Sequence, residues 1–198
     1  MKFRTFAGSH GGRILFVSLP VAVASALVMG GVAHGDVPVS FSISGSPFKI
    51  AATELSGTSF SQYAGVATDT DGVDHAVAIA NIGQATLVDL CQSVAAETPL
   101  GPMSLVITAG GSGGAPAEAT DLQIGMTDLK GDTEFTNVRI GVDASTVSTA
   151  AKGGAGSFAQ DSDTIHITGL QQISYSTQAG VFTLPNMHVA LTEGQECF

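Results

Sequence analysis

Basic residues are scarce in this sequence. Only seven of the 198 residues are Lys or Arg, whereas 17 are Asp or Glu. Three of the seven bases (Lys2, Arg4 and Arg13) precede residue 14. Residues 36–198 therefore carry four bases and all 17 acids, a net charge of −13. Such an acidic surface repels phosphate backbones, so nucleic acid is not expected as a partner.

Tryptophan is absent, and no segment after residue 36 spaces its apolar residues as an amphipathic helix does. Apolar and polar residues alternate instead, in residues 37–43, 122–126, 138–142 and 187–191. Each run places its apolar side chains on one face of a strand. A helix competes with a strand in residues 84–96, but β-branched residues and the following Pro99 favour the strand.

These patterns predict one all-β domain that covers residues 36–198. We expect an antiparallel sheet of roughly eight to twelve strands, either sandwich-like or curled into a β-groove. A β-solenoid is the alternative, although the short regular repeat of a solenoid is missing.

Residues 1–35 have the order of a secretory signal. The three bases precede an uncharged run at residues 14–32, and small residues follow at Ala33 and Gly35. The run is long for a signal core and near the length of a bilayer span. We expect either a cleaved signal peptide or an uncleaved membrane anchor. In both cases residues 36–198 are secreted or lie on the outer face of the cytoplasmic membrane.

Only two cysteines are present, Cys91 and Cys197. An even number of cysteines in an exported chain predicts a disulfide bond between them. Two free thiols are the alternative. A metal site at either cysteine is less expected, because no His or second Cys lies beside it at ligand spacing.

Two segments of the sequence are similar to each other: FKIAATELSGTSF (48–60) and LQIGMTDLKGDTEF (122–135). Leu55 matches Leu129, and Gly57 matches Gly131. We interpret each copy as a strand, a turn and a second strand. The glycine would take the positive-φ position of the turn, and the leucine would fill the core beneath it. Chance similarity between two hairpins is the alternative to a duplication.

The stretch GGSGG (110–114) matches the G-x-S-x-G pattern of esterases, with Ser112 as the nucleophile. That pattern requires a strand before the serine and a helix after it, but residues 115–120 have room for one helical turn at most. Asp163 and His166 would complete a Ser–Asp–His order, which is a weak signal in a chain rich in Ser and Asp. We therefore expect a glycine-rich loop and no catalytic residue.

No cofactor and no metal is expected. His166 and His188 alternate with apolar residues, which is typical of surface histidines. A weak calcium candidate exists in the acidic stretch at residues 69–75, with the carboxylates of Asp69, Asp71 and Asp74. The stretch lacks the spacing of an EF-hand loop, so an acidic β-turn is favoured.

Seven segments carry a resemblance to a known family. They are LCQSV (90–94), GPMSLVITAG (101–110), ATDLQIGMTDL (119–129), IGVDAST (140–146), GGAGSFAQ (153–160), STQAGVFTLPNM (176–187) and the terminal ECF. The chain resembles small exported proteins of Streptomyces and related actinobacteria that have no known function and are often labelled cholesterol esterase. The resemblance implies membrane association, because such proteins usually keep the N-terminal hydrophobic segment.

Three functions are compatible with the sequence. The first is a non-catalytic binding or structural module of the cell envelope. Its partner would be a membrane protein or a lipid. The second is a carrier of lipid or another apolar ligand, because aliphatic strand faces can curl into a groove. The third is an ester hydrolase that uses Ser112. An apolar cavity larger than packing voids would favour the carrier. The sequence does not predict whether the chain forms homo-oligomers.

Overall fold

The described part of the chain is almost entirely β-strand. The computed structural model describes residues 42–43, 45–99, 101–111 and 113–198. The elements are β1 (Ser42–Ile43), β2 (Phe48–Asp69), β3 (Asp74–Val88), β4 (Leu90–Thr98), β5 (Gly101–Ala109), β6 (Ala117–Thr136), β7 (Arg139–Asp143), the 3₁₀ helix η1 (Ala144–Thr146), β8 (Phe158–Gln178), β9 (Val181–Thr183) and β10 (His188–Thr192). This confirms the all-β prediction, and residues 84–96 are strand apart from Asp89.

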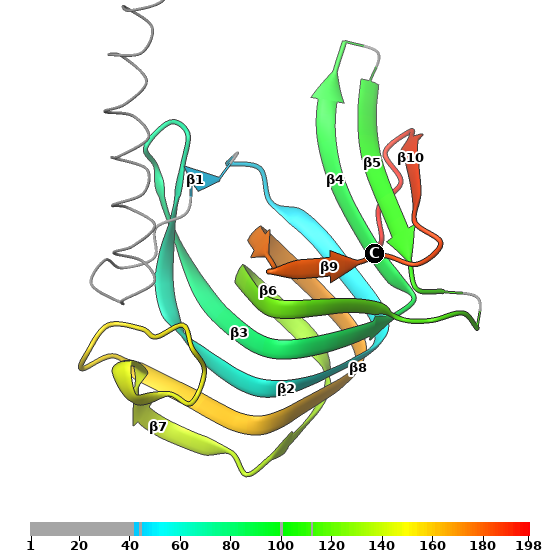
Figure 1. Cartoon of the computed structure of the whole chain (residues 1–198). Coiled ribbons are helices and arrows are strands. Elements are labelled where there is room, and N and C mark those ends of the chain that lie inside the picture. Colours follow the sequence, from blue (N-terminus) through cyan, green and yellow to red (C-terminus); the bar gives the residue numbers. More distant parts are fainter. Residues whose placement is uncertain (1–41, 44, 100, 112) are drawn as a thin grey trace, which may run out of the picture. The chain divides into compact units, whose positions relative to one another are not determined.

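Four long strands close into a small barrel. β2 pairs with β3, β3 with β6, β6 with β8, and β8 returns to β2, and all four pairings are antiparallel (Figure 1). The sheet therefore curls and closes on itself instead of forming two stacked layers. β1 adds to β2 in parallel, β7 extends the sheet beyond β8, and β9 pairs with β6. No described helix is long and apolar enough to cross a membrane.

The barrel interior is filled by aliphatic and aromatic side chains from all four strands. They form one buried cluster that includes Leu55, Phe60, Ile82, Leu122, Ile124, Met126, Ile165, Ile167 and Leu170. Residues 1–41 lie outside the described residues. The structure therefore leaves untested the predicted leader and most of the predicted strand at residues 37–43.

The long strands bend at two levels, and each bend changes which residues face the interior. Along β2 the interior residues are Ile50 and Ala52, then Leu55, then Phe60. The alternation shifts by one residue between these groups. One shift occurs at Ser59, which has a φ of 55° and is skipped in the pairing with β3 and β8. A shift of one residue keeps apolar side chains inside a strand that curves strongly.

The bends lie in line across neighbouring strands. Ser59 of β2 lies level with Gly83 of β3, and Gly83 lies level with Asp121 of β6, where φ is 49°. At the second level, Thr53 of β2 lies opposite Gly169 of β8, which has a φ of 65°. Because the paired strands shift at the same level, β2 stays in register with β3 and β8, and β3 stays in register with β6, whereas the pairing of β6 with β8 changes register.

Neither Gly57 nor Gly131 lies at a chain reversal, although Gly131 has the predicted positive φ, at 154°, beside a register shift between β6 and β8. Both glycines, and Leu55 and Leu129 beside them, lie inside continuous strands. The glycines serve close packing instead, because a Cβ atom on either would lie 2.5 Å from the Cγ2 atom of an isoleucine on the next strand. At Gly57 β2 is paired with β3 and β8 on its two sides, and at Gly131 β6 is paired with β8. Leu55 is buried in the core, and Leu129 packs against it.

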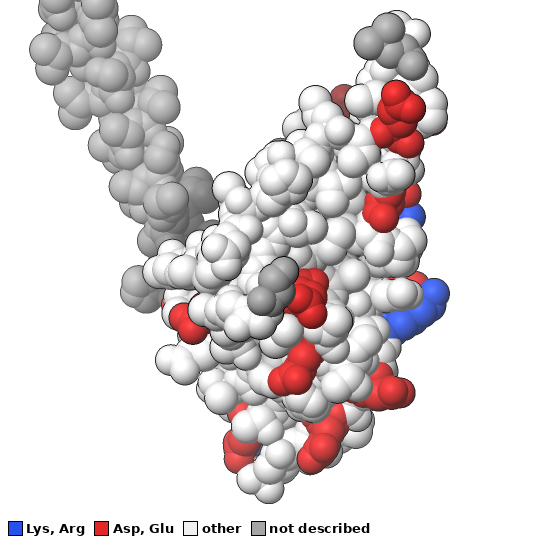
Figure 2. Space-filling view, turned by 90° about the vertical axis from the view of Figure 1, so that its right-hand side faces the viewer, with Lys and Arg blue, Asp and Glu red and all other residues white. Residues whose placement is uncertain are grey.

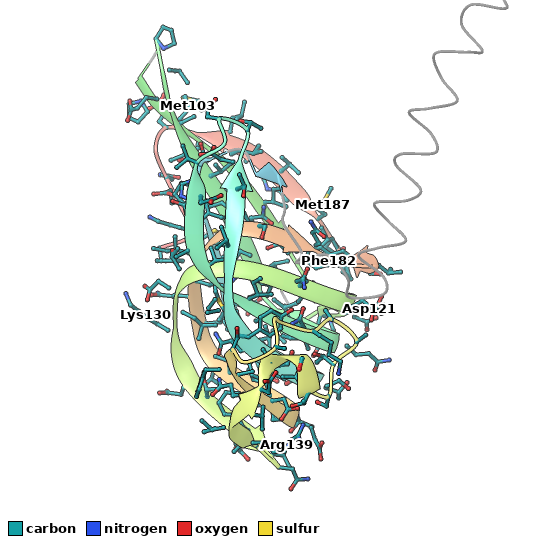
Figure 3. The ribbon with its side chains drawn as sticks, turned by 90° about the vertical axis from the view of Figure 1, so that its left-hand side faces the viewer. Met103, Asp121, Lys130, Arg139, Phe182 and Met187 are labelled. Carbon is teal, nitrogen blue, oxygen red and sulfur yellow. A yellow bond between two sulfur atoms is a disulfide. The ribbon has the colours of Figure 1, made fainter. Side chains whose placement is uncertain are left out.

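A buried carboxylate fixes the outer strand β7 and the loop that follows η1. Asp161 of β8 is 1% exposed. It accepts hydrogen bonds from the Arg139 guanidinium, through Nε at 2.9 Å and through Nη2, and from the backbone N–H of Ser148 at 2.7 Å. Figure 3 labels Arg139 on the barrel side opposite the tip of β4 and β5. The Arg139 hydrogen bonds hold the pKa of Asp161 below its ordinary value, although burial opposes this shift.

We expect Asp161→Asn to lower the free energy of unfolding by about 1–2 kcal/mol near pH 7, because one charge-assisted pair is lost. The folded pKa lies below the unfolded value of about 3.9. The contribution of the carboxylate is therefore complete above that value and is lost as the pH falls through the folded pKa. Urea unfolding of both proteins between pH 2.5 and 7 measures this. A difference that stays constant down to pH 2.5 would contradict the assignment.

Candidate functional site

Three strands extend the sheet beyond the barrel. β4 pairs with β2 over only three residue pairs, then continues away from the barrel, where it pairs with β5. β5 pairs in turn with β10. We call these three strands the wall. In Figure 1 the wall rises beside the barrel opening, with β10 at the end of the sheet.

One face of the wall is apolar. Cross-strand partners lie on the same face of a sheet, and the register aligns Leu191, Leu105 and Val94 across the three strands. The next aligned row holds Val189, Ile107 and Gln92. We call this surface the apolar face and define it by Val94, Met103, Leu105, Ile107, Val189 and Leu191. The alternating positions of the three strands on this face contain no charged residue.

Three residues of the apolar face, Leu105, Val189 and Leu191, are exposed to solvent, and the other three are half-buried. Leu191 is 72% exposed, Val189 is 49% exposed, and Met187 just before β10 is 54% exposed. A soluble domain seldom leaves neighbouring large apolar side chains uncovered, and such surfaces mark interaction sites. The alternation at residues 187–191 predicts β10 correctly, but the apolar side chains of this strand do not enter the core.

The opposite face of the wall is polar and carries the C-terminal segment. Cys91 and Cys197 form the predicted disulfide bond, and the backbone N–H of Cys197 donates to Ser93 Oγ at 3.1 Å. Lys49 Nζ forms an ion pair with Glu196 Oε2 at 2.7 Å. Figure 2 views the molecule from the side of the wall. Among the charged residues on this side, Asp and Glu outnumber Lys and Arg.

The apolar face continues into the mouth of the barrel. Gln92, in the same row as Val189, lines a small cavity of about 20 Å³ together with Phe182 of β9. Phe182 is itself 37% exposed. Figure 3 shows Met103 near the tip of the wall, with Met187 and Phe182 closer to the barrel. The exposed apolar surface therefore reaches from the tip of the wall to the barrel.

The barrel interior holds a separate apolar cavity of about 110 Å³. Its lining includes Leu55, Phe60, Met126, Phe135 and Ile165. A cavity of about 150 Å³ can hold benzene, whereas ordinary ligand sites occupy about 300–1,000 Å³. This cavity is thus larger than a packing void and smaller than a site that binds an acyl chain.

The residues proposed for ester hydrolysis are engaged elsewhere or lie outside the described residues. Ser112 lies outside them, so the Ser112 hypothesis stays untested. Asp163 Oδ2 accepts a hydrogen bond from Asn137 Nδ2 at 2.7 Å, and His166 Nδ1 lies 3.0 Å from Ser56 Oγ. His166 and His188 lie on β8 and β10, which are not neighbours in the sheet.

The calcium candidate is the turn between β2 and β3. Asp69 Oδ1 accepts the backbone N–H groups of Asp71 and Val73, and Asp69 Oδ2 lies 3.0 Å from His75 Nε2. The hydrogen bond from His75 is the main cause of the lowered pKa of Asp69. Asp74 accepts instead from Thr68 Oγ1. The described residues include no group of three or more His, Cys, Asp or Glu side chains arranged to hold a metal ion.

Sequence reasoning missed the apolar face as a site. The signal was present in two alternating runs, Met103, Leu105 and Ile107 in β5 and Val189 and Leu191 in β10. Alternation shows that one side of a strand is apolar, but it does not show what covers that side. The exposed fractions of Leu105, Val189 and Leu191 show that no described element covers these side chains.

Residues 44–198 match the model of a family described as Family of unknown function (DUF6230), and the chain therefore belongs to this family. Neither a curated protein nor a solved structure matches the chain.

Proposed function

We propose that this member of the family is a non-catalytic binding module on the outside of the cell, and that its apolar face receives an extended segment of a partner protein. The observation that carries the proposal is the exposed, uncharged face on the last strand of the sheet. The partner segment would place apolar side chains at alternate positions, against Leu191, Val189 and the neighbouring residues of β5.

Strand addition at β10 would provide both affinity and specificity. Within the described residues β10 pairs with β5 alone, so its second edge has backbone groups available for another strand. Proteins usually protect such an edge with lysine, proline or an inward-pointing charge. Residues His188–Thr192 contain none of these. In strand addition the backbone gives affinity, and the alternating side chains give specificity.

The acidity of the domain restricts the partner. Residues 36–198 have a net charge of −13, and acidic residues outnumber basic ones on the side of the molecule shown in Figure 2. A basic or neutral partner avoids repulsion, and a basic one would associate faster at low salt. We therefore infer an apolar segment with basic or neutral flanks.

A carrier of lipid or another apolar ligand is the alternative. The 110 Å³ interior cavity favours it only for a molecule about the size of one aromatic ring. A lipid chain on the apolar face would leave the backbone edge of β10 without a hydrogen-bond partner. A protein strand satisfies both the apolar side chains and the edge.

The location outside the cell rests on residues 1–35 of the sequence. If residues 14–32 remain as an anchor, the nine residues that connect them to β1 reach about 30 Å when extended. The partner would then be a membrane protein or a protein held close to the membrane. An actinobacterial origin belongs to the same proposal.

Site-specific photocrosslinking in the host's own envelope tests the proposal. A benzophenone amino acid replaces Leu191 in one strain and Ile140 in another. Ile140 is the matched control, because it is 67% exposed on β7, at the other end of the sheet. We expect a crosslink from position 191 to one protein, through an extended apolar peptide, and little from position 140. The isolated partner should bind the wild type and the Ile140→Glu variant, but bind Leu191→Glu at least about tenfold more weakly.

Three other outcomes would overturn the proposal. Crosslinking of position 191 to lipid would support the carrier. Crosslinking to a second copy of this chain would indicate self-association. Equal labelling from positions 191 and 140 would show that the apolar face has no specific partner.

A further inference from the structure

A polar cleft lies at the first level of strand bending, on the barrel rather than on the wall. Its volume is about 360 Å³, within the range of small-molecule sites. The polar residues that line it come from five parts of the chain, and we call the site they form the polar cleft: Ser59, Asn81, Asp121, Gln123, Thr149 and Gln178. Figure 3 shows Asp121 near the yellow loop that contains Thr149.

A chain of hydrogen bonds fixes the floor of the polar cleft. Gln123 Nε2 donates to Asn81 Oδ1 at 2.6 Å, and Asn81 Nδ2 donates to Ser61 Oγ at 3.2 Å. Ser61 Oγ lies 2.6 Å from Thr149 Oγ1, which donates to the carbonyl of Ala151. All donors point the same way along this chain, an arrangement that strengthens each bond.

Burial makes this floor rigid. Ser61, Asn81 and Thr149 are each 5% exposed or less. Their hydrogen bonds tie β2 and β3 to the loop after η1, which forms one rim of the polar cleft. Side chains held by buried partners give a site that is formed before its ligand arrives.

The rim carries three solvent-exposed polar groups that accept or donate no hydrogen bond within the described residues and are therefore free to meet a ligand. They are the Ser59 hydroxyl, the Asp121 carboxylate and the Gln178 amide. Ser59 and Asp121 also have positive φ values of 55° and 49°. Such conformations concentrate at ligand sites, and the bend places both residues at one cleft.

The polar residues of the lining disfavour three classes of ligand. An anion would meet the Asp121 carboxylate, and no Lys, Arg or His lines the polar cleft. An apolar molecule would desolvate amides and hydroxyls without satisfying them. An organic cation would lack the aromatic face that such ligands favour, because no aromatic side chain lines the site.

We propose that the polar cleft binds a neutral, hydroxyl-rich small molecule, a sugar. A sugar hydroxyl both donates and accepts hydrogen bonds, and the Gln123 and Gln178 amides offer both functions. The Asp121 carboxylate can accept hydrogen bonds from two hydroxyls. This inference does not depend on the wall, because the polar cleft shares no residue with the apolar face.

Titration with sugars, followed by NMR of the labelled protein, tests the proposal. The probes are glucose, galactose, mannose, N-acetylglucosamine, trehalose, maltose and cellobiose, each to 20 mM. Glucuronate and decanoate serve as the anionic and apolar probes. We expect at least one neutral sugar to give saturable shifts at residues of the polar cleft. Asp121→Asn and Ser59→Gly should each weaken binding, by about tenfold or more for Asp121→Asn.

The two variants separate binding from folding. Glycine adopts the φ of Ser59 without strain, and asparagine tolerates the φ of Asp121, so both variants keep the fold. Asp71→Asn, at an exposed carboxylate in the β2–β3 turn, is the matched control and should leave binding unchanged. The proposal fails if no neutral sugar gives saturable shifts or if Asp121→Asn binds as the wild type does. It also fails if glucuronate or decanoate binds there more tightly than every sugar.

Discussion

Loss of the Cys91–Cys197 disulfide is expected to lower the free energy of unfolding by about 4–5 kcal/mol. The bond joins residues separated by 106 positions, so it closes a loop that contains every element from β5 to β10. In the chain-entropy account, a loop of this size removes many conformations from the unfolded chain. A domain of this size has a total stability of about 5–15 kcal/mol, so the bond represents a large share.

Urea unfolding of the wild type, the reduced wild type and the Cys91→Ser/Cys197→Ser variant measures this effect. The last two proteins should agree, because both lack only the crosslink. The matched control is Lys49→Ala, which removes the Lys49–Glu196 ion pair but keeps the disulfide. That pair is partly exposed, so we expect a change below about 1 kcal/mol. A loss of less than about 1 kcal/mol in the disulfide variant would show that the unfolded chain stays compact without the bond.

Much of the fold follows from local patterns. Residues 122–126 alternate apolar and polar side chains, and Leu122, Ile124 and Met126 are buried in β6 as that alternation predicts. The disulfide follows from a count of two cysteines in a chain that the sequence predicts to be exported, because the count leaves one pairing. Neither inference requires knowledge of strand order.

The bends could not be predicted from alternation. Ile50, Leu55 and Phe60 all face the interior, but their spacing of five residues fits no single strand pattern. The spacing follows from shifts near Thr53 and at Ser59, where the backbone leaves regular β geometry. A search for period two therefore breaks the 22-residue strand β2 into pieces and places turns between them. The sequence predicts Gly57 to be a turn residue for the same reason, because it lies between two of these pieces.

The two candidate sites depend on tertiary arrangement. The apolar face lies on strands that continue beyond the barrel, and this strand order is a property of the whole chain. The polar cleft combines Ser59, Asp121 and Thr149, which lie far apart in sequence and meet only because the bends of β2 and β6 coincide. Asp and Ser are common in this chain, so no local signal distinguishes these positions.

Gly57→Ala is expected to lower the free energy of unfolding by about 2–3 kcal/mol, although the change adds a single methyl group. The new Cβ would lie 2.5 Å from Ile82 Cγ2 and 3.2 Å from Ile165 Cγ2. Both methyl groups belong to β-branched side chains of neighbouring strands, so neither can move aside without a rotamer change in the barrel interior. Gly154→Ala is the control, because its Cβ would meet only Ser157 Oγ, at 3.6 Å, and its stability should change little.

A double-mutant cycle with Ile82→Ala identifies the cause. Ile82→Ala alone should lower stability by about 2–5 kcal/mol, because it leaves a cavity in the core. In the double variant the alanine at position 57 fills part of that space. The combined loss should therefore be smaller than the sum of the two single losses by about 1–2 kcal/mol. Additive losses would mean that Gly57 is required for its backbone conformation, as a turn residue would be. Coupled losses would mean that it is required because β2 and β3 approach too closely for any side chain.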